Sequence, residues 1–442
     1  MALLPNPILR LTHYKNGLVF ASQGLASGAT LIIALVLTRH LGLHGFGAFS
    51  VVWLLGQLAQ QVQHALFVAP MLSMLPARQG QAAHALETGI FTWGHTFAAL
   101  CGVLTFALLH LPFLPQLASW VPQARAGTGL CITLLLLHDL TRRRAYAKGQ
   151  AQRVLLQDVA TYTIQGLALS LAIATHQLTP TTVWWCFAAG YGAGLFVIRL
   201  WYGVIWLAPN YSRAVLGQLW QYSRWLLAAQ TMQWWAGNYY LVLAGTLLGA
   251  EALGALRMCQ TVMGVLHVLL QALENLVPVK AAALLSRKGQ QAFARYIKKV
   301  LVQVLAVAAL FVMAIAGAGT YLLQVLFGAA ATTHGSLLFW LAAMYLLVGA
   351  GTVFRFALRT KAVNAPTFWG YTLSAGLAWL LAPQLIQTYG AYGAMMGFWA
   401  NQAVMLLVLL PAFYRVLANR PPLKGPLQLA RYTYNKLLAN QH

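Results

Sequence analysis

Residues 41–49 read LGLHGFGAF, and residues 248–256 read LGAEALGAL. Both stretches fit the frame L-G-x-x-x-F/L-G-A-F/L, and 207 positions separate them in a chain of 442 residues. A repeat at nearly half the chain length predicts two similar halves that follow one another. We place these halves at residues 1–208 and 209–420, and a basic tail at residues 421–442.

The composition around these motifs indicates a membrane protein. Hydrophobic residues make up 60% of the chain, charged residues only 7%, and the mean hydropathy is +0.68. A soluble domain carries about 25% charged residues. Apolar stretches of about 20 residues, the length of a membrane-spanning helix, recur from end to end. The alternating segments of about 10 residues that a transmembrane barrel needs do not occur in the sequence.

The apolar stretches predict an all-α polytopic membrane protein with twelve transmembrane helices. They form two six-helix halves around a central cavity. The predicted spans lie near residues 16–38, 48–75, 87–111, 125–146, 154–175, 181–207, 222–247, 252–277, 299–323, 335–357, 363–387 and 393–417.

The distribution of positive charge then orients these helices. The chain has 28 Lys and Arg residues against 5 Asp and Glu residues. With twelve spans and both termini in the cytoplasm, all but Arg39, Arg125 and Arg257 fall on the cytoplasmic side. The positive-inside rule explains this segregation without nucleic acid as a partner. We therefore expect a multi-pass protein of the bacterial inner membrane.

Polar side chains form stripes on four of the predicted spans, namely the first and second and their equivalents, the seventh and eighth. Polar groups at membrane depth usually face a partner helix or a wet cavity. The stripes predict the lining of a common cavity for a polar ligand, although for any one residue a helix-packing role is the alternative. The predicted lining residues are Gln23, Gln57, Gln61, His64, Gln230, Trp234, Asn238, Gln260, His267 and Gln271.

Three arginines are candidates for binding phosphate groups. Arg39 and Arg257 lie near the outer ends of their spans, where positive-inside orientation does not explain them, and Arg224 opens the seventh span. A guanidinium group binds phosphate through two parallel hydrogen bonds. The alternatives are snorkelling of Arg39 and Arg257 to the interface and anchoring of Arg224 at the cytoplasmic side.

The acidic residues are few enough to consider individually. We expect Asp139 to pair with Arg142 or Arg143, and Asp158 to lie in the first turn of its helix, where negative charge is favoured. For Glu274 two interpretations stay open. It pairs with Lys280 or with the network around Arg257, or it binds a coupling proton or Na⁺.

Catalytic and metal motifs are missing from the sequence. It contains no GxSxG, HExxH or phosphate-binding lysine loop, and its four cysteines stand singly in apolar segments. We therefore expect no enzyme activity, no metal site and no cofactor.

The stretch from Gly24 through Thr38-Arg39-His40-Leu41-Gly42 to Gly45-Phe46-Gly47-Ala48-Phe49 resembles a family signature. The signature, R-x-L-G-x-x-x-F/Y-G, is that of the polysaccharide exporters, the Wzx-type flippases of the MOP superfamily. That superfamily also contains the MATE drug exporters and the lipid II flippase. The resemblance extends over the whole chain in span count, topology and internal repeat.

This resemblance implies an alternating-access flippase. Its cargo would be an undecaprenyl-pyrophosphate-linked oligosaccharide, moved across the inner membrane for surface polysaccharide biosynthesis. Membrane lipids, a polysaccharide polymerase and glycosyl transferases would be its further partners. The alternative is a MATE-type ion-coupled exporter of small solutes or drugs. Spans one, two and seven have no carboxylate for ion coupling, which argues against this alternative. A third possibility, a membrane scaffold for glycan assembly, would not require polar cavity stripes.

Overall fold

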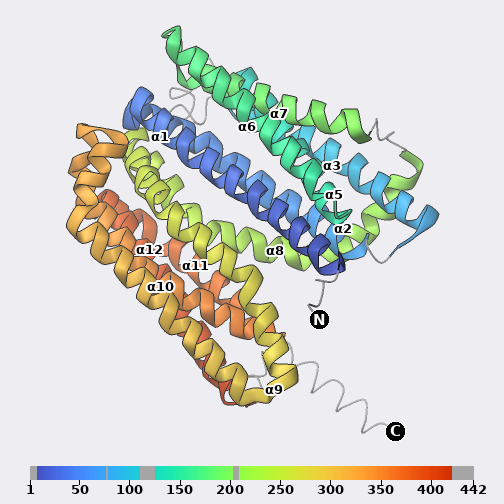
Figure 1. Ribbon diagram of the computed structural model, residues 1–442. Coiled ribbons are helices and arrows are strands. Elements are labelled where there is room, and N and C mark those ends of the chain that lie inside the picture. Colours follow the sequence, from blue (N-terminus) through green and yellow to red (C-terminus); the bar gives the residue numbers. More distant parts are fainter. Residues whose placement is uncertain (1–6, 76–77, 110–124, 203–208, 421–442) are drawn as a thin grey trace, which may run out of the picture. The chain divides into compact units, whose positions relative to one another are not determined.

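The computed structural model describes residues 7–75, 78–109, 125–202 and 209–420 (Figure 1). These residues form helices joined by short turns, and no strand occurs among them. The predicted all-α fold is therefore confirmed.

The helices follow the predicted spans closely. In chain order they are α1 (Pro7–Gln63), the π-helix η1 (His64–Val68), α2 (Ala69–Met74), α3 (Gly80–Leu108), α5 (Arg125–Ala147), α6 (Ala151–Ala174), α7 (Pro180–Tyr202), α8 (Pro209–Leu248), α9 (Ala250–Phe327), the 3₁₀ helix η2 (Ala329–His334), α10 (Gly335–Thr360), α11 (Ala365–Tyr389) and α12 (Ala391–Leu417).

The two longest helices, α1 and α9, each contain two arms because a glycine folds each of them. Gly42 in α1 has φ 68° and ψ −179°, and Gly289 in α9 has φ 75° and ψ −174°. Residues with a side chain rarely adopt this left-handed φ, so glycine is required at such a reversal. When α1 and α9 are divided at these glycines, the described residues contain twelve helical segments long enough to span a membrane.

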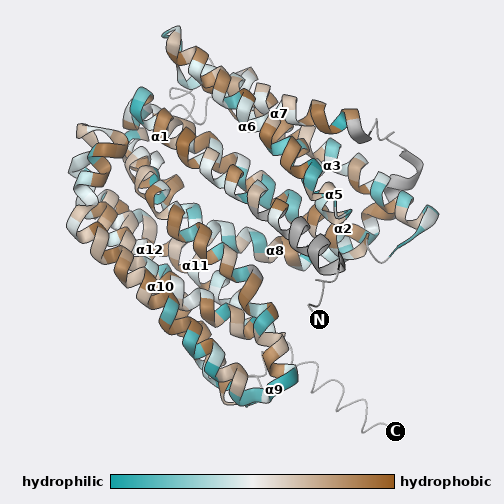
Figure 2. Cartoon of the chain, viewed as in Figure 1, coloured by the Kyte–Doolittle hydropathy of each residue, from teal (hydrophilic) through white to brown (hydrophobic). Residues whose placement is uncertain are grey.

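A criterion that combines length with hydropathy is stricter than length alone. By length and hydropathy together, six helices of the described chain qualify as membrane-spanning, among them α1 and α9, each of which contains two arms. Hydrophobic residues run along both arms of α9, and hydrophilic residues gather at its turn (Figure 2). The chain is therefore a multi-pass membrane protein.

The described chain forms two compact units. The first unit comprises Met1–Thr261 with Leu326–Gly328, and the second comprises Val262–Val325 with Ala329–His442. Since α8 and the start of α9 pack in the first unit, the boundary between the units differs from that of the sequence repeat. The predicted halves, 1–208 and 209–420, therefore stay a prediction.

Each unit has its own apolar core. In the first unit, Ile90 and Phe91 of α3 pack with Leu140 of α5 and Leu219 of α8. The core of the second unit joins both arms of α9 to α10 and α12. There the rings of Phe354 and Phe413 stack with centroids 4.1 Å apart. Exposed apolar side chains elsewhere on the helices suit a hydrocarbon solvent.

The two repeat motifs contact each other inside the first unit. A Cβ atom added to Gly47 would overlap the carbonyl oxygen of Ala250, and one added to Gly254 would overlap that of Leu43. At the offset of 207, Gly47 corresponds to Gly254 and Leu43 to Ala250. The two close approaches are therefore equivalent under the repeat. Only glycine permits helices to meet at this distance, and this is the physical reason for the repeated G-A step.

Candidate functional site

The polar stripe on the second arm of α1, which follows Gly42, ends in the π-helix η1. Pro70 explains why the helix is irregular there. Proline has no backbone N–H, so the carbonyl of Leu66 cannot receive its helical hydrogen bond. Ser223 of α8 supplies a replacement, because its Oγ donates to Leu66 O at 3.4 Å. Such π-turns often occur at functional sites. The proline thus places an irregular turn directly at His64, the last residue of the stripe.

Neighbouring glutamines on this segment have different surroundings. Gln63 is fully buried, and its Nε2 donates to the carbonyl of Leu136 on α5 at 3.0 Å. Gln57, Gln61 and His64 lie on another face and are half-buried. Nδ1 of His64 is buried without a hydrogen-bond partner among the described residues. Gln63 therefore joins two helices, whereas the predicted site residues keep polar groups available.

Helix α8 packs against α1 in the first unit and carries the next group of predicted residues. Gln230 and Asn238 are half-buried, and Nδ2 of Asn238 donates to the carbonyl of Trp234 at 3.0 Å. Trp234 is buried, yet its Nε1 donor has no acceptor in the described part of the chain. The rings of Trp235 and Tyr239 stack with centroids 4.8 Å apart. This face combines amides and aromatic rings, the two groups that proteins use to bind sugars.

Arg257 is the cation with the most unusual surroundings. It lies in the first arm of α9, directly after Leu256, the last residue of the repeat motif, and its Nη1 donates to Oε1 of Gln260 at 3.2 Å. Its Nε is buried and has no acceptor among the described residues. None of the ion pairs found in the described ranges includes Arg257. Burying a charge without a counter-charge is costly, so this guanidinium is suited to receive an anion.

The other two predicted phosphate ligands are exposed. Nε of Arg39 donates to the carbonyl of Leu326 at 2.6 Å, at the C-terminal end of α9. A cation there satisfies an open carbonyl and the negative end of the helix dipole. The guanidinium of Arg224 lies 6.0 Å from the ring centre of Trp225. Gln23 is likewise exposed. Thus the structure gives Arg39 a capping contact that the sequence did not predict.

The remaining predicted residues belong to the second unit. His267, Gln271 and Glu274 are exposed on the first arm of α9. Glu274 pairs with Nη1 of Arg359 on α10 at 3.3 Å. The side chains of this pair are 54% and 64% exposed. Glu274 is therefore in an ion pair, but its partner is Arg359, and the predicted pairing with Lys280 or the Arg257 network was wrong.

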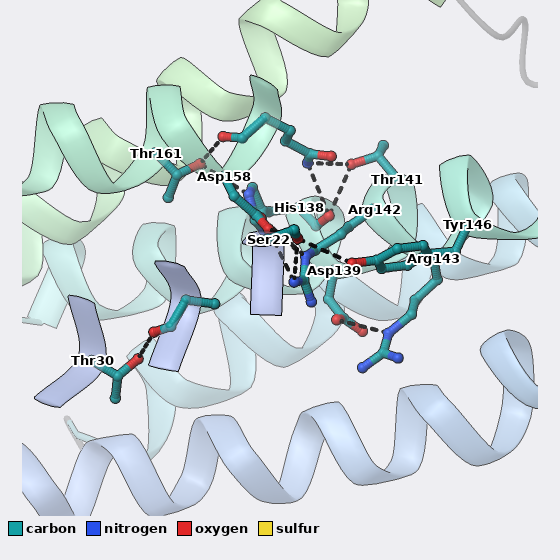
Figure 3. A network of polar contacts seen from close by, with 12 residues as sticks. Ser22, Thr30, His138, Asp139, Thr141, Arg142, Arg143, Tyr146, Asp158 and Thr161 are labelled. Carbon is teal, nitrogen blue, oxygen red and sulfur yellow. Dashed lines mark hydrogen bonds and ion pairs between the residues drawn. The ribbon is translucent and has the colours of Figure 1, made fainter. Parts of the chain in front are cut away.

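A buried polar network in the first unit joins α1, α5 and α6 (Figure 3). Asp158 of α6 accepts from Nη2 of Arg142 on α5 at 3.0 Å and from Oγ of Ser22 on α1 at 2.5 Å. The hydroxyl of Tyr146 lies 3.0 Å from the same Oγ. Asp139 pairs with Arg143 at 3.3 Å, as predicted. The network holds three helices together through charge-assisted hydrogen bonds.

The prediction for Asp158 was wrong. Helix α6 starts at Ala151, because Gly149 with φ 68° ends the preceding turn, so its first turn contains no acid. Asp158 lies two turns inside the helix, where the buried guanidinium of Arg142 balances its charge.

A second ion-pair cluster ties α3 to α5. Glu87 accepts from Nε of Arg144, and it pairs with Nζ of Lys148 at 2.6 Å. The signal for both clusters was present in the sequence, since α5 carries three consecutive arginines in an apolar segment. The identity of the partners could not be known, because Glu87 is 57 residues away from Arg144. The positive-inside rule had explained these basic residues only by the orientation of the helices, and the two clusters show that they also form ion pairs between helices.

The described residues offer no set of three or more His, Cys, Asp or Glu side chains that could hold a metal ion. The described part of the first unit offers buried N–H donors, amides, aromatic rings and the guanidinium of Arg257 with its buried Nε, which are groups that can bind a polar ligand.

Comparisons with known proteins give a family match for part of the chain and a fold match for most of it. Residues 148–334 match a family model described as polysaccharide biosynthesis protein. No curated protein sequence matches the chain. Among solved structures, an inward-facing MATE family transporter of the MOP superfamily has a TM-score of 0.69 at 13% identity. That match covers 90% of this chain and 95% of the transporter.

Two further structures have the same fold. The lipid II flippase MurJ, in an inward closed conformation, has a TM-score of 0.69 at 11% identity, covering 91% of this chain and 90% of MurJ. A MOP superfamily transporter from Pyrococcus furiosus, whose binding pocket is described as having reverse polarity, has a TM-score of 0.62 at 14% identity. The match covers 91% of this chain and 96% of that protein. The chain therefore has the fold of these MOP superfamily transporters, and its residues 148–334 are similar to a polysaccharide biosynthesis family, which supports the predicted resemblance to the polysaccharide exporters.

Proposed function

We propose that this protein is a flippase that moves a lipid-linked oligosaccharide across the bacterial inner membrane. The cargo would be an undecaprenyl-pyrophosphate-linked repeat unit for surface polysaccharide. One observation carries the proposal: Arg257 is a cation with a buried donor and no counter-ion among the described residues. A pyrophosphate supplies both the negative charge and the acceptors that this side chain lacks.

Other polar groups of the first unit suit the rest of such a cargo. Nδ1 of His64 and Nε1 of Trp234 are buried and unpartnered in the described chain, and the amides of Gln57, Gln61 and Gln230 are half-buried. Unpartnered buried polar groups are costly, so a protein retains them where a ligand uses them. Hydroxyl-rich sugars offer acceptors and donors for this set. Arg39 and Arg224 are further cations for the pyrophosphate, with Gln23, Asn238, Gln260, His267 and Gln271 as further polar contacts.

Charge balance argues against export of cationic drugs. Glu87, Asp139, Asp158 and Glu274 are all in ion pairs. The fifth acid, Glu251, lies in the first turn of α9, where the positive helix end stabilises it. A cationic substrate or a coupling ion would have to compete with a guanidinium or ammonium group already in contact with four of these five carboxylates. The chain is better suited to an anionic cargo.

We further propose the inner membrane as the location, with both termini in the cytoplasm. The proposed partners are membrane lipids, a polysaccharide polymerase and glycosyl transferases, and the protein would act as a transporter with no enzyme activity, metal or cofactor. The predicted central cavity between the halves belongs to the same proposal. The proposed orientation in the membrane rests on the segregation of all but three Lys and Arg residues to one side.

Substitution of Arg257 tests the proposed function. In a strain that depends on this protein, Arg257→Ala should lower surface polysaccharide about 10- to 100-fold and cause lipid-linked oligosaccharide to accumulate. Arg257→Lys should retain part of the activity, because it keeps the charge but loses the two-pronged geometry. Arg359→Ala is the matched control, an exposed arginine of the second unit. Normal polysaccharide in the Arg257→Ala strain, at normal protein level, would overturn the proposal.

A MATE-type ion-coupled exporter is the second candidate, and one observation favours it. The Glu274–Arg359 pair is exposed, so Glu274 can leave its partner at a lower cost in free energy than the other paired carboxylates. Such an exporter would extrude cationic dyes in a proton- or Na⁺-dependent way, and Glu274→Gln would abolish this efflux. If wild-type cells show no ion-dependent efflux, this candidate is eliminated.

A further inference from the structure

An apolar groove runs between the two arms of α9 in the second unit. It has a volume of about 870 Å³, and α10 contributes Tyr345 and Gly349 to its wall. Leucine, valine and alanine side chains of both arms form most of the remaining lining. Several of them are strongly exposed, including Leu276 at 55% and Val279 at 71%. The groove is therefore open to the surroundings of the helix, which in a membrane are lipid.

One end of the groove is basic. Lys280 on the first arm and Lys299 on the second arm both line it, on either side of the turn at Gly289. Nζ of Lys280 lies 5.4 Å from the ring centre of Tyr296, which also lines the groove. Both lysines are exposed, and neither takes part in an ion pair within the described ranges. No acidic residue lines the groove. The groove thus combines an apolar wall with a positively charged mouth.

The groove has the length of a single lipid leaflet. Between Lys280 and Leu266, both of which line it, the helix rises about 21 Å at 1.5 Å per residue. Half of a bilayer with its headgroup region measures about 20–22 Å. The lysines lie at the end of α9 that the positive-inside rule assigns to the cytoplasm. A phosphate held at this depth would place the lipid's chains along the apolar wall.

We propose that this groove is a binding site for an anionic glycerophospholipid of the cytoplasmic leaflet. Lys280 and Lys299 bind its phosphate, and the leucine and valine wall of α9 holds its acyl chains. Basic pockets between helices on the cytoplasmic side recognise anionic headgroups in this way. The site shares no residue with the proposed cargo contacts, and the proposal holds whatever cargo the protein moves.

Adjacent residues of the chain provide a matched control. Lys298 and Lys299 are consecutive, yet Lys298 does not line the groove. Lys288, next to the turn, does not line it either. A Lys280→Gln/Lys299→Gln variant and a Lys288→Gln/Lys298→Gln variant therefore remove the same charge from the same end of α9. Only the first variant changes the proposed site.

The experiment measures lipid retention by the full-length protein in detergent, by native mass spectrometry with added phosphatidylglycerol, phosphatidylcholine or a polyprenyl phosphate. The wild type should retain phosphatidylglycerol preferentially. Lys280→Gln/Lys299→Gln should lower its apparent affinity about 10- to 30-fold, and the control variant should leave it unchanged. A third variant, Leu276→Trp, should narrow the groove and weaken retention of both glycerophospholipids while keeping both lysines.

Three outcomes would overturn the proposal. Equal retention of the two glycerophospholipids by the wild type would show that the site does not select charge. An equal loss in the two double variants would assign the effect to surface charge in general. Retention of a polyprenyl lipid in preference to phosphatidylglycerol would assign the groove to the cargo instead. Gel filtration of each variant checks that it is folded.

Discussion

Helix α5 in the first unit and the arms of α9 in the second unit use positive charge in opposite ways. In the first unit, the consecutive arginines of α5 each contact a carboxylate: Arg142 with Asp158, Arg143 with Asp139 and Arg144 with Glu87. In the second unit, the arms of α9 carry Lys280 and Lys299 with no ion pair in the described ranges.

This difference shows how basic residues on the same side of the membrane acquire different roles. The basic residues of both regions satisfy the positive-inside rule equally well. Arg142 and Arg144 of α5 are enclosed by neighbouring helices and need fixed counter-charges, because an unpaired buried charge is costly. Those of α9 stand at the surface of a single bent helix and face lipid or water. They remain available for an anion, and the following predictions test this comparison.

The largest effect is expected at the buried pair in the first unit. Asp158→Leu leaves Arg142 buried without its counter-charge, since their side chains are 1% and 11% exposed. The substitution should lower the free energy of unfolding by about 3–5 kcal/mol. Thermal unfolding of the purified protein in detergent measures this loss.

The double variant Asp158→Leu/Arg142→Met is the control. Because it removes both charges, it should recover most of the stability. If Asp158→Leu alone is as stable as the wild type, the pair does not hold the first unit together.

A smaller effect is expected where a neutral side chain makes an internal contact. Gln63→Leu removes the hydrogen bond to the carbonyl of Leu136, which should cost about 1 kcal/mol of stability. Gln61→Leu, two residues earlier on another face, should leave stability unchanged and lower polysaccharide export. Thermal unfolding and surface polysaccharide are measured for both. The distinction between packing and site residues fails if the two variants behave alike.

The smallest effect is expected at the exposed pair of the second unit. Glu274→Gln and Arg359→Ala should each change stability by less than about 1 kcal/mol, because exposed ion pairs contribute little. The same unfolding assay in low and high salt checks this. A loss as large as that of Asp158→Leu would remove the contrast between buried and exposed ion pairs.

The sequence by itself determined that this protein lies in a membrane and that it is built of membrane-spanning helices. So few charges cannot cover a water-exposed surface, and the length of the apolar stretches is set by bilayer thickness. The repeated L-G-x-x-x-F/L-G-A-F/L frame predicted related segments, and the structure places Gly47 and Gly254 in equivalent close approaches. These properties depend on composition and local spacing, so a single chain displays them without knowledge of its contacts.

Only the tertiary structure decided which polar groups are already engaged. Gln61 and Gln63 are alike in sequence, but only Gln63 meets a carbonyl of another helix. Asp158 was expected at a helix end and instead lies opposite Arg142, and Arg39 caps the end of α9 at Leu326. Hydrogen bonds and ion pairs depend on distances of about 3 Å between segments far apart in the chain. Spacing along one helix cannot predict such distances, so the availability of Arg257 became visible only in the folded protein.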